Sequence, residues 1–145
     1  AMPMRRLADE LGVSDRVELP GQLSRAALRD LYARSHAFVL PSERESFGIA
    51  ALEARAAGLP VIAMLASGVR DFVRQGVDGL LAHDDAELSR HISRLALDAP
   101  FRDYVRHRNS VMAPPYDWRD VCAMHLEFYA LANARRTPAV RRATG

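Results

Sequence analysis

The fold is decided by the stretch from residue 40 to residue 63, which reads LPSERESFGIAALEARAAGLPVIA. It begins at the end of an apolar run, passes through a polar loop into an alanine-rich segment, and ends in a second apolar run after Gly58-Leu59-Pro60. Short apolar runs of this kind are typical of strands buried on both faces of a parallel sheet. The order strand, loop, helix, strand therefore predicts a unit of an α/β fold.

The same alternation continues on both sides of this stretch. Apolar residues at helical spacing, polar caps and the positions of glycine and proline predict the elements. We expect helices at residues 4–11, after the cap Ser24, at 47–57 with Ser46 as cap, at 69–74, from Asp84 or Asp85 to Leu97, from Pro100, and at 117–133. We expect strands at residues 16–19, 37–40, 61–64 and 79–82. The predicted fold class is α/β, a Rossmann-like parallel sheet flanked by helices.

Composition excludes several classes of protein. The chain has 145 residues, 49% of them hydrophobic, and a formal net charge of +2, which is too small to indicate nucleic-acid binding. All basic residues are arginine, so the chain has no lysine for a Walker phosphate loop or a Schiff base. Cys122 is the single cysteine, which excludes an intrachain disulfide and a cysteine-bound zinc. The longest uncharged run, residues 56–69, is too short for a transmembrane helix.

The C-terminal part divides into a helix and a tail. Four aromatic residues at or near the last predicted helix have spacings that suit core packing, and we expect them in the core: Tyr116, Trp118, Phe128 and Tyr129. Periodicity ends after Arg136, and the remainder is rich in arginine. We therefore predict one domain over residues 2–136 and a mobile basic tail over residues 137–145.

Two carboxylates and a glycine indicate an elongated ligand. Phe47 and Gly48 lie where the first free N–H groups of a helix point outward, and a diphosphate fits there. Glu45 and Glu53 are about 12 Å apart at the helical rise. This exceeds the roughly 5–9.5 Å between paired glycosidase carboxylates, so an acid/base pair is disfavoured. Because carboxylates accept hydrogen bonds from vicinal hydroxyls, a ribose at Glu53 and a hexose at Glu45 would complete the contacts.

These residues resemble the signature of group 1 retaining glycosyltransferases of the GT-B fold. The stretch carries the E-x7-E pattern of that family and its alanine-rich A-x-A-x-G-x-P-V segment. Weaker similarities lie in the runs Asp15–Gly21, Gly76–Leu81 and Asp117-Trp118. The resemblance implies that residues 2–136 form part of the nucleotide-sugar-binding domain in the C-terminal half of a GT-B fold, without its first strands.

The resemblance also implies a role for each residue of the motif. Glu45 would bind hydroxyls of the donor sugar and is the candidate catalytic residue, while Glu53 would bind the ribose. Ser46, Phe47, Gly48 and Ile49 would line the sugar and the diphosphate with backbone groups. Gly21 and Gln22 would lie in the loop that approaches the base. No metal ligand and no cofactor other than the nucleoside diphosphate sugar substrate is implied.

The function that this resemblance implies is transfer of a hexose from a nucleoside diphosphate sugar to a carbohydrate or lipid-linked acceptor. The expected place is the cytoplasm, with peripheral contact at the inner membrane face. Two alternatives remain open. One is a non-catalytic module that retains nucleotide-sugar binding or only the fold, and that associates with a partner. The other is a different GT-B enzyme, such as a sugar-nucleotide epimerase.

The expected strand order has a consequence for the sheet. In the order 3-2-1-4-5-6, the predicted strands at 16–19, 37–40, 61–64 and 79–82 would be the third to sixth, with a gap of two strands after the third. Unpaired edges are templates for further pairing. We therefore expect the open edges to be paired with a second copy or covered by rearranged helices. The resemblance separately implies a missing N-terminal domain, which in the family binds the acceptor.

Overall fold

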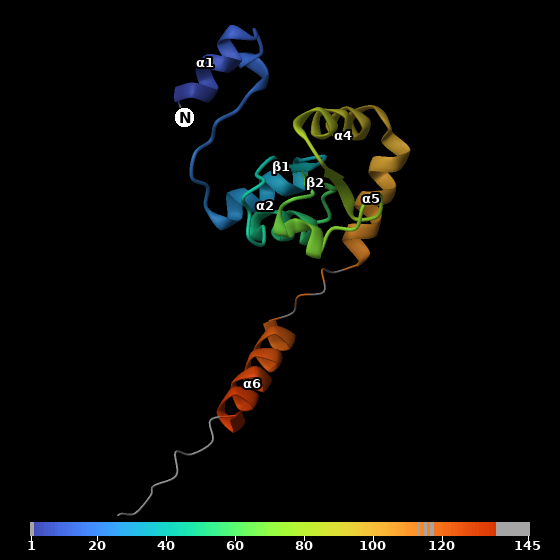
Figure 1. Ribbon diagram of the computed structural model, residues 1–145. Helices are drawn as coiled ribbons and strands as arrows, with labels where there is room; N and C mark the ends of the chain where they lie inside the picture. The colour runs from blue at the N-terminus through green and yellow to red at the C-terminus, as the bar shows by residue number, and fades with distance from the viewer. Residues whose placement is uncertain (1, 113, 115, 117, 136–145) are drawn as a thin grey trace, which may run out of the picture.

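The computed structural model describes residues 2–112, 114, 116 and 118–135. Its centre is a parallel sheet in which β1 (Phe38–Leu40), β2 (Val61–Met64) and β3 (Gly79–Ala82) lie in the order β1-β2-β3 (Figure 1). Phe38 pairs with Val61, and Val61 pairs with Gly79. The central strand β2 is fully buried, as the apolar run predicts, whereas β1 is only half-buried. The predicted fold class is confirmed.

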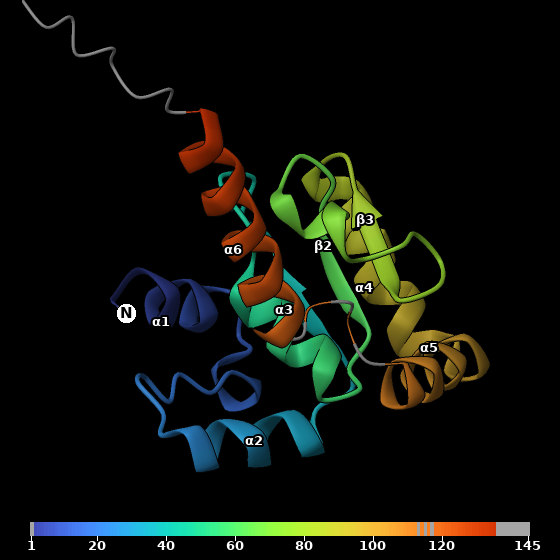
Figure 2. The ribbon, with the colours of Figure 1, turned by 90° about the horizontal axis from the view of Figure 1, so that it is seen from below.

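Helices surround this sheet and extend beyond it. They are α1 (Met2–Glu10), α2 (Arg25–Arg34), α3 (Ile49–Ala56), α4 (Asp85–Leu97), α5 (Ala99–Val111) and α6 (Trp118–Arg135), with short 3-10 turns η1 (Ser14–Arg16) and η2 (Gly68–Asp71). Figure 2 shows α3 and α4 on opposite sides of the strands. The connection from β1 to β2 runs through α3, and the one from β2 to β3 runs through η2 on the same face. Helix α4 after β3 covers the opposite face, so that both faces of the sheet are covered as in doubly wound folds.

The core alternates along the strands. Side chains of Val61 and Ala63 pack toward α3 and η2, whereas those of Ile62 and Met64 pack toward α4. This period of two is the consequence of strand geometry, in which successive side chains point to opposite faces. Both faces of β2 are therefore closed, and its carboxyl end leads directly to the loop before η2.

Three helix starts have side-chain caps, of which Ser24 and Asp84 were predicted and Asp98 was not. The side chain of Ser24 accepts a hydrogen bond from the N–H of Ala27, and Asp84 accepts one from Glu87. Asp98, the residue before α5, accepts one from the N–H of Phe101. Such caps satisfy N–H groups that have no partner inside the helix. Asp84, and not Asp85, is thus the cap of α4.

Two predictions of local structure are wrong. The strand expected at residues 16–19 is absent, because Arg16 ends the 3-10 turn η1 and residues 17–20 form no regular element. An extended segment becomes a strand only when a neighbour pairs with its N–H and C=O groups, and β1 pairs with β2 alone. The helix expected at residues 69–74 is only the 3-10 turn η2.

The absence of that strand also corrects the expected gap. The three observed strands are adjacent, so the described sheet is continuous and has β1 and β3 at its edges. Among the described residues, no strand pairs with the outer side of β1. Pairing of this edge with a second copy stays a prediction.

We predicted that the aromatic residues of the last helix pack in the core, and for this helix the prediction is wrong. Phe128 and Tyr129 are 63% and 66% exposed on α6. Figure 1 shows α6 extending away from the sheet, which is why its side chains have no core to enter. Tyr116, just before α6, does pack against other rings, although it is 37% exposed. The side chain of Trp118 and the tail 137–145 lie outside the described residues.

Candidate functional site

The start of α3 lies at the carboxyl end of β1 and has no side-chain cap. Gly48 occupies the cap position with φ 85°, a left-handed conformation that glycine adopts without steric cost. Ser46, which we predicted as the cap, is displaced from that role because the helix begins three residues later, at Ile49. The N–H groups of Ile49, Ala50 and Ala51 consequently have no acceptor within the described part of the chain.

Glu45 shapes the turn that leads to this helix. Its carboxylate Oε1 accepts a hydrogen bond from the N–H of Gly48 at 3.1 Å, and its carbonyl accepts one from the N–H of Gly68 at 2.8 Å. The first bond bends the loop toward the helix, and the second ties the loop after β1 to the loop after β2. The predicted sugar-binding carboxylate is therefore half-buried and already engaged with the backbone of the motif.

Two glycines allow this close approach of loops. A Cβ atom on Gly68 would lie 2.0 Å from the carbonyl oxygen of Ser46, and one on Gly48 would lie 2.6 Å from Cγ2 of Val69. Neither distance is compatible with a side chain, since real Cβ contacts are longer than 3.0 Å. The residue types at both positions are thus dictated by the contact between the two loops.

The Phe47 side chain holds the turn against the protein core. Its ring packs against Phe72 and Tyr116, with centroid separations of 5.4 Å and 5.2 Å. The side chain is half-buried against the core cluster on the α3 face of the sheet. The ring therefore points into the protein. Gly48 is buried as well, so the exposed backbone at the helix start belongs to Ile49 and Ala50.

Glu53 and Ile49 lie on the exposed surface of α3. Ile49 is 66% exposed, so its side chain has no part in the core. Glu53 faces Tyr32 of α2: burial and the Glu53 carboxylate together raise the pKa of that phenol. Glu53 itself makes no hydrogen bond through its side chain within the described residues, and its carboxylate is available to a ligand.

No hydrogen bond of the described residues joins Gly21 or Gln22 to the motif. Both lie on the exposed loop between η1 and α2, where Gly21 has φ 68° and neither residue makes a hydrogen bond to described atoms. The structure therefore brings Glu45, Ser46, Phe47, Gly48, Ile49 and Glu53 together at α3 and leaves the two residues of the base loop apart from them.

Two surface depressions of the described chain lie away from the motif. One, between the end of α3 and α5, is lined by Ala57, Gly58, Asp103, Arg106, His107 and Ser110. Another, beside α1, is lined by Arg5, Ala8, Asp9, Ser14, Val17 and Leu19. Neither of these two includes a residue from 45 to 53.

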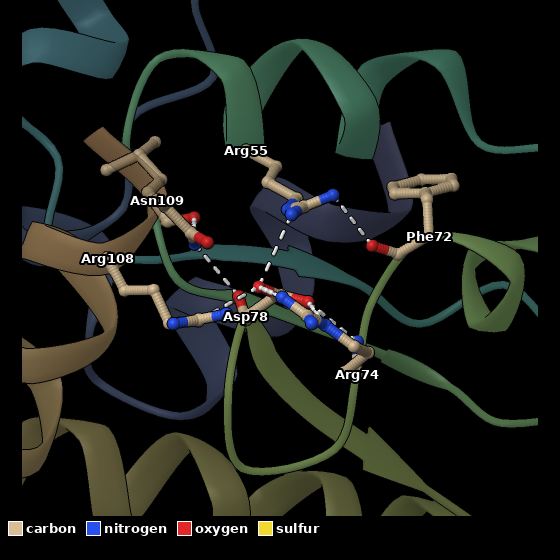
Figure 3. Close-up of polar contacts among 7 residues, drawn as sticks. Arg55, Phe72, Arg74, Asp78, Arg108 and Asn109 are labelled. Carbon is tan, nitrogen blue, oxygen red and sulfur yellow. Dashed lines mark hydrogen bonds and ion pairs between the residues drawn. The ribbon is translucent and has the colours of Figure 1, made fainter. Parts of the chain in front are cut away.

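A buried ion cluster on the other side of α3 holds the site in place (Figure 3). Asp78, fully buried before β3, accepts two hydrogen bonds from the Arg74 guanidinium at 2.7 and 2.9 Å. Arg55 of α3 lies 3.3 Å from the same carboxylate and donates to the carbonyl of Phe72 at 2.9 Å. Asn109 donates to the carbonyls of Leu59 and Asp78.

This cluster was not predicted from the sequence. Arg108 of α5 is a third arginine near Asp78, at 3.7 Å, so one carboxylate faces three guanidinium groups. Arg55 links α3 to the carbonyl of Phe72, and the Phe72 ring contacts Phe47. The cluster thus fixes the far end of the helix whose start forms the candidate site. The signal that could have revealed it is Arg55, a charged residue within an alanine-rich segment that was expected to pack against the sheet.

Asp78 is ionised because its arginine partners outweigh its burial. Burial acts to raise the pKa of the carboxyl group, but hydrogen bonds from the side chain and backbone N–H of Arg74, with the charge of Arg55, lower it below its ordinary value. For Arg55, burial lowers the pKa against the attraction of Asp78. The cluster therefore contributes to folding in its charged form.

The pKa shift of Asp78 predicts a pH dependence of stability. Because its folded-state pKa lies below the unfolded value of about 3.9, its contribution is fully present above that value and is lost as the pH falls through the folded pKa. The free energy of unfolding can be measured in urea for the wild type and for Asp78→Asn between pH 7 and pH 3. The difference between the two proteins should be constant above about pH 5 and should shrink toward pH 3. A difference that stays constant down to pH 3 contradicts the shift.

Together these features define a class of protein. A parallel sheet whose strand ends meet an uncapped helix start is the arrangement that α/β proteins use for phosphorylated ligands. The family model described as glycosyl transferases, group 1, matches residues 2–110. The chain belongs to the group 1 glycosyltransferase family, as the motif predicts.

The relatives of this chain are longer proteins. The D-inositol 3-phosphate glycosyltransferase of Streptosporangium roseum is 34% identical over 136 residues, which are 91% of this chain and 31% of that protein. The corresponding protein of Mycolicibacterium smegmatis is 42% identical over 92 residues, or 62% of this chain and 21% of that protein. The chain thus spans about a third of the length of the first relative or less.

Solved structures show the same fold. Sucrose-phosphate synthase from Thermosynechococcus elongatus superposes with a TM-score of 0.75 at 28% identity, covering 91% of this chain and 34% of the synthase. Anabaena HepE in complex with UDP gives a TM-score of 0.68 at 26% identity, covering 77% of this chain and 31% of that chain. Within the described residues, no helix has the length and apolarity to cross a membrane.

Proposed function

We propose that this chain forms the donor-binding half of a retaining glycosyltransferase that moves a hexose from a nucleoside diphosphate sugar to a carbohydrate or lipid-linked acceptor. The single observation that carries the proposal is the uncapped start of α3, because three other helices of the described chain have side-chain caps and this one does not. The N–H groups of the exposed residues Ile49 and Ala50 have no acceptor within the described chain and lie between Glu45 and Glu53 in the sequence, where a diphosphate would accept from them.

In this proposal each end of the donor meets one carboxylate. Glu53, exposed on α3, binds the ribose hydroxyls, and Glu45 binds the hexose. The backbone amides of Ile49 and Ala50, rather than a metal ion, offset the charge of the diphosphate. The N–H of Gly48 is buried and stays with the Glu45 carboxylate. HepE, a similar structure, has been solved in complex with UDP.

Catalysis needs a second surface. The relatives that share this family are about three times longer than this chain. We propose that an acceptor-binding domain supplies the other wall, and that Glu45 and the amides of α3 position the donor at its edge. Gly21 and Gln22 would approach the base from the loop before α2, and action at the cytoplasmic membrane face stays part of the proposal.

Calorimetric titration with UDP, GDP and ADP tests donor binding directly. We expect micromolar binding of one of the three nucleotides. In Glu53→Ala the affinity for that nucleotide should fall by about 10- to 100-fold, which corresponds to the free energy of a hydrogen bond to a charged group. The matched control is Glu43→Ala. Glu43 is an exposed carboxylate in the loop between β1 and α3, and this variant should bind nucleotide as the wild type does. Flat titrations with all three nucleotides would contradict the proposal and favour a non-catalytic module that retains only the fold.

Glu45 needs a separate pair of variants because it has a structural contact. Glu45→Gln keeps an oxygen that accepts from the Gly48 N–H, whereas Glu45→Ala removes it. If Glu45 binds the sugar, nucleotide affinity should be nearly unchanged in Glu45→Gln, and hydrolysis or transfer of the hexose by the complete enzyme should fall. Undiminished transfer in Glu45→Ala would contradict its assigned role.

A further inference from the structure

Tyr116 brings a ring from a distant part of the chain to the candidate site. It lies between α5 and α6, and its ring contacts Phe47 edge-on, with centroids 5.2 Å apart and an interplanar angle of 85°. The same ring contacts Phe72 at 6.2 Å and 90°. Residues 2–110 match the family, so Tyr116 lies beyond the matched part. The three rings form a closed set that we call the aromatic triad: Phe47, Phe72 and Tyr116.

The triad controls the turn that exposes the amides. Phe47 immediately precedes Gly48, the cap residue of α3, so a rotation of the Phe47 backbone redirects the first N–H groups of the helix. Phe72 supports the ring from the core side and is 3% exposed. Tyr116 is the half-exposed member that covers the cluster from outside, at 37% exposure. Without it, one side of the Phe47 ring would face solvent.

The contact depends on the ring of Tyr116 and not on its hydroxyl. The N–H of Tyr116 donates to the carbonyl of Pro114 at 2.8 Å. Its phenolic oxygen makes no hydrogen bond within the described residues. Edge-on aromatic pairs contribute beyond their buried area because the positive edge of one ring meets the negative face of another. A phenylalanine at this position would therefore preserve the interaction.

We propose that Tyr116 is a positioning residue for donor binding, acting through Phe47 on the amides at the start of α3. The inference rests on the proposed function for its ligand, a nucleoside diphosphate. It gives the connector before α6 a direct effect on the donor site. Tyr116 does not touch the ligand in this arrangement; it keeps the turn from Ser46 to Gly48 in the conformation that the ligand needs.

Two measurements test this on the whole chain, with Tyr116→Ala, Tyr116→Phe and the control Tyr129→Ala, whose ring is 66% exposed on α6. In nucleotide titrations, Tyr116→Ala should weaken binding about three- to tenfold, the equivalent of one aromatic contact. Tyr116→Phe and Tyr129→Ala should bind within about twofold of the wild type. Binding by Tyr116→Phe as weak as that by Tyr116→Ala would overturn the proposal, since it would make the hydroxyl the acting group.

Hydrogen exchange separates this inference from the proposed function. Tyr116→Ala should speed exchange of the amides at residues 46–51 while leaving those of β2 unchanged, whereas a general loss of stability would speed both. If the wild type binds none of the three nucleotides, the proposed function fails, yet the exchange result still decides whether Tyr116 positions the turn. Unchanged exchange at residues 46–51 in Tyr116→Ala would overturn the inference whatever the titrations show.

Discussion

Replacing Asp78 by asparagine should lower the free energy of unfolding by about 3–5 kcal/mol, the range for breaking a buried ion pair by removing one partner. The side chains of Arg55 and Asp78 are 3% and 0% exposed, so the arginine would keep its charge in the interior with only neutral acceptors, the Phe72 carbonyl and the asparagine amide oxygen. Asparagine has nearly the same shape, so the loss measures the charge and not a cavity. Urea unfolding monitored by circular dichroism gives the value.

The remaining members of the cluster provide the controls. Arg74→Ala removes a partner whose side chain is 58% exposed, and its effect should be much smaller than that of Asp78→Asn. The double variant Arg55→Met with Asp78→Asn should be more stable than the sum of its single changes, because it leaves no unpaired buried charge. A loss below about 0.5 kcal/mol in Asp78→Asn, the ordinary range for surface changes, would show that the cluster is dispensable.

Replacing Gly68 by alanine should separate the two loops that form the candidate site. The added Cβ would lie 2.0 Å from the Ser46 carbonyl oxygen and 3.0 Å from Cα of Phe47, and both neighbours are backbone atoms that cannot rotate away. The loop must move, and the hydrogen bond from the Gly68 N–H to the Glu45 carbonyl is lost. We expect a loss of stability of about 1–3 kcal/mol, typical of overpacking, and nucleotide binding at least tenfold weaker.

Gly12→Ala is the matched control for this substitution. Gly12 has φ 64° with no atom near its Cβ position, so alanine there costs about 1–2 kcal/mol of backbone strain without touching the motif. The control should therefore lower stability and leave nucleotide affinity unchanged. Equal affinity losses in Gly12→Ala and Gly68→Ala would show that binding follows overall stability and not the contact between the loops.

Sequence patterns predicted the elements whose determinants are local. The apolar run 61–64, the caps Ser24 and Asp84 and the family motif all depend on residues close together in the chain, and the structure places them as expected. The strand at 16–19 was predicted from the same kind of pattern and does not form, because a strand also requires a neighbour. The exposure of Phe128 was missed for the equivalent reason, since spacing describes a helix face but not what covers it.

The candidate site also contains residues that local sequence patterns identify and residues that only the structure identifies. Glu45, Phe47, Gly48 and Glu53 were identified from their order in the motif, whereas Gly68 and Tyr116 entered only through contacts between separate segments. The buried cluster around Asp78 was missed because its arginines come from α3, from the loop after η2 and from α5. These segments are far apart in the sequence, and only the three-dimensional fold brings their side chains into contact.

The parallel order of the sheet has a consequence for biosynthesis. β1 ends at Leu40, and its only described partner, β2, begins at Val61, so the two never form a hairpin. A ribosome that adds about 5–20 residues per second leaves the nascent β1 without a partner for roughly 1–4 s. During that interval its apolar run is open to other chains, and slower translation between codons 41 and 60 would lengthen the exposure. Overproduction of this chain should therefore benefit from a chaperone that shields nascent segments.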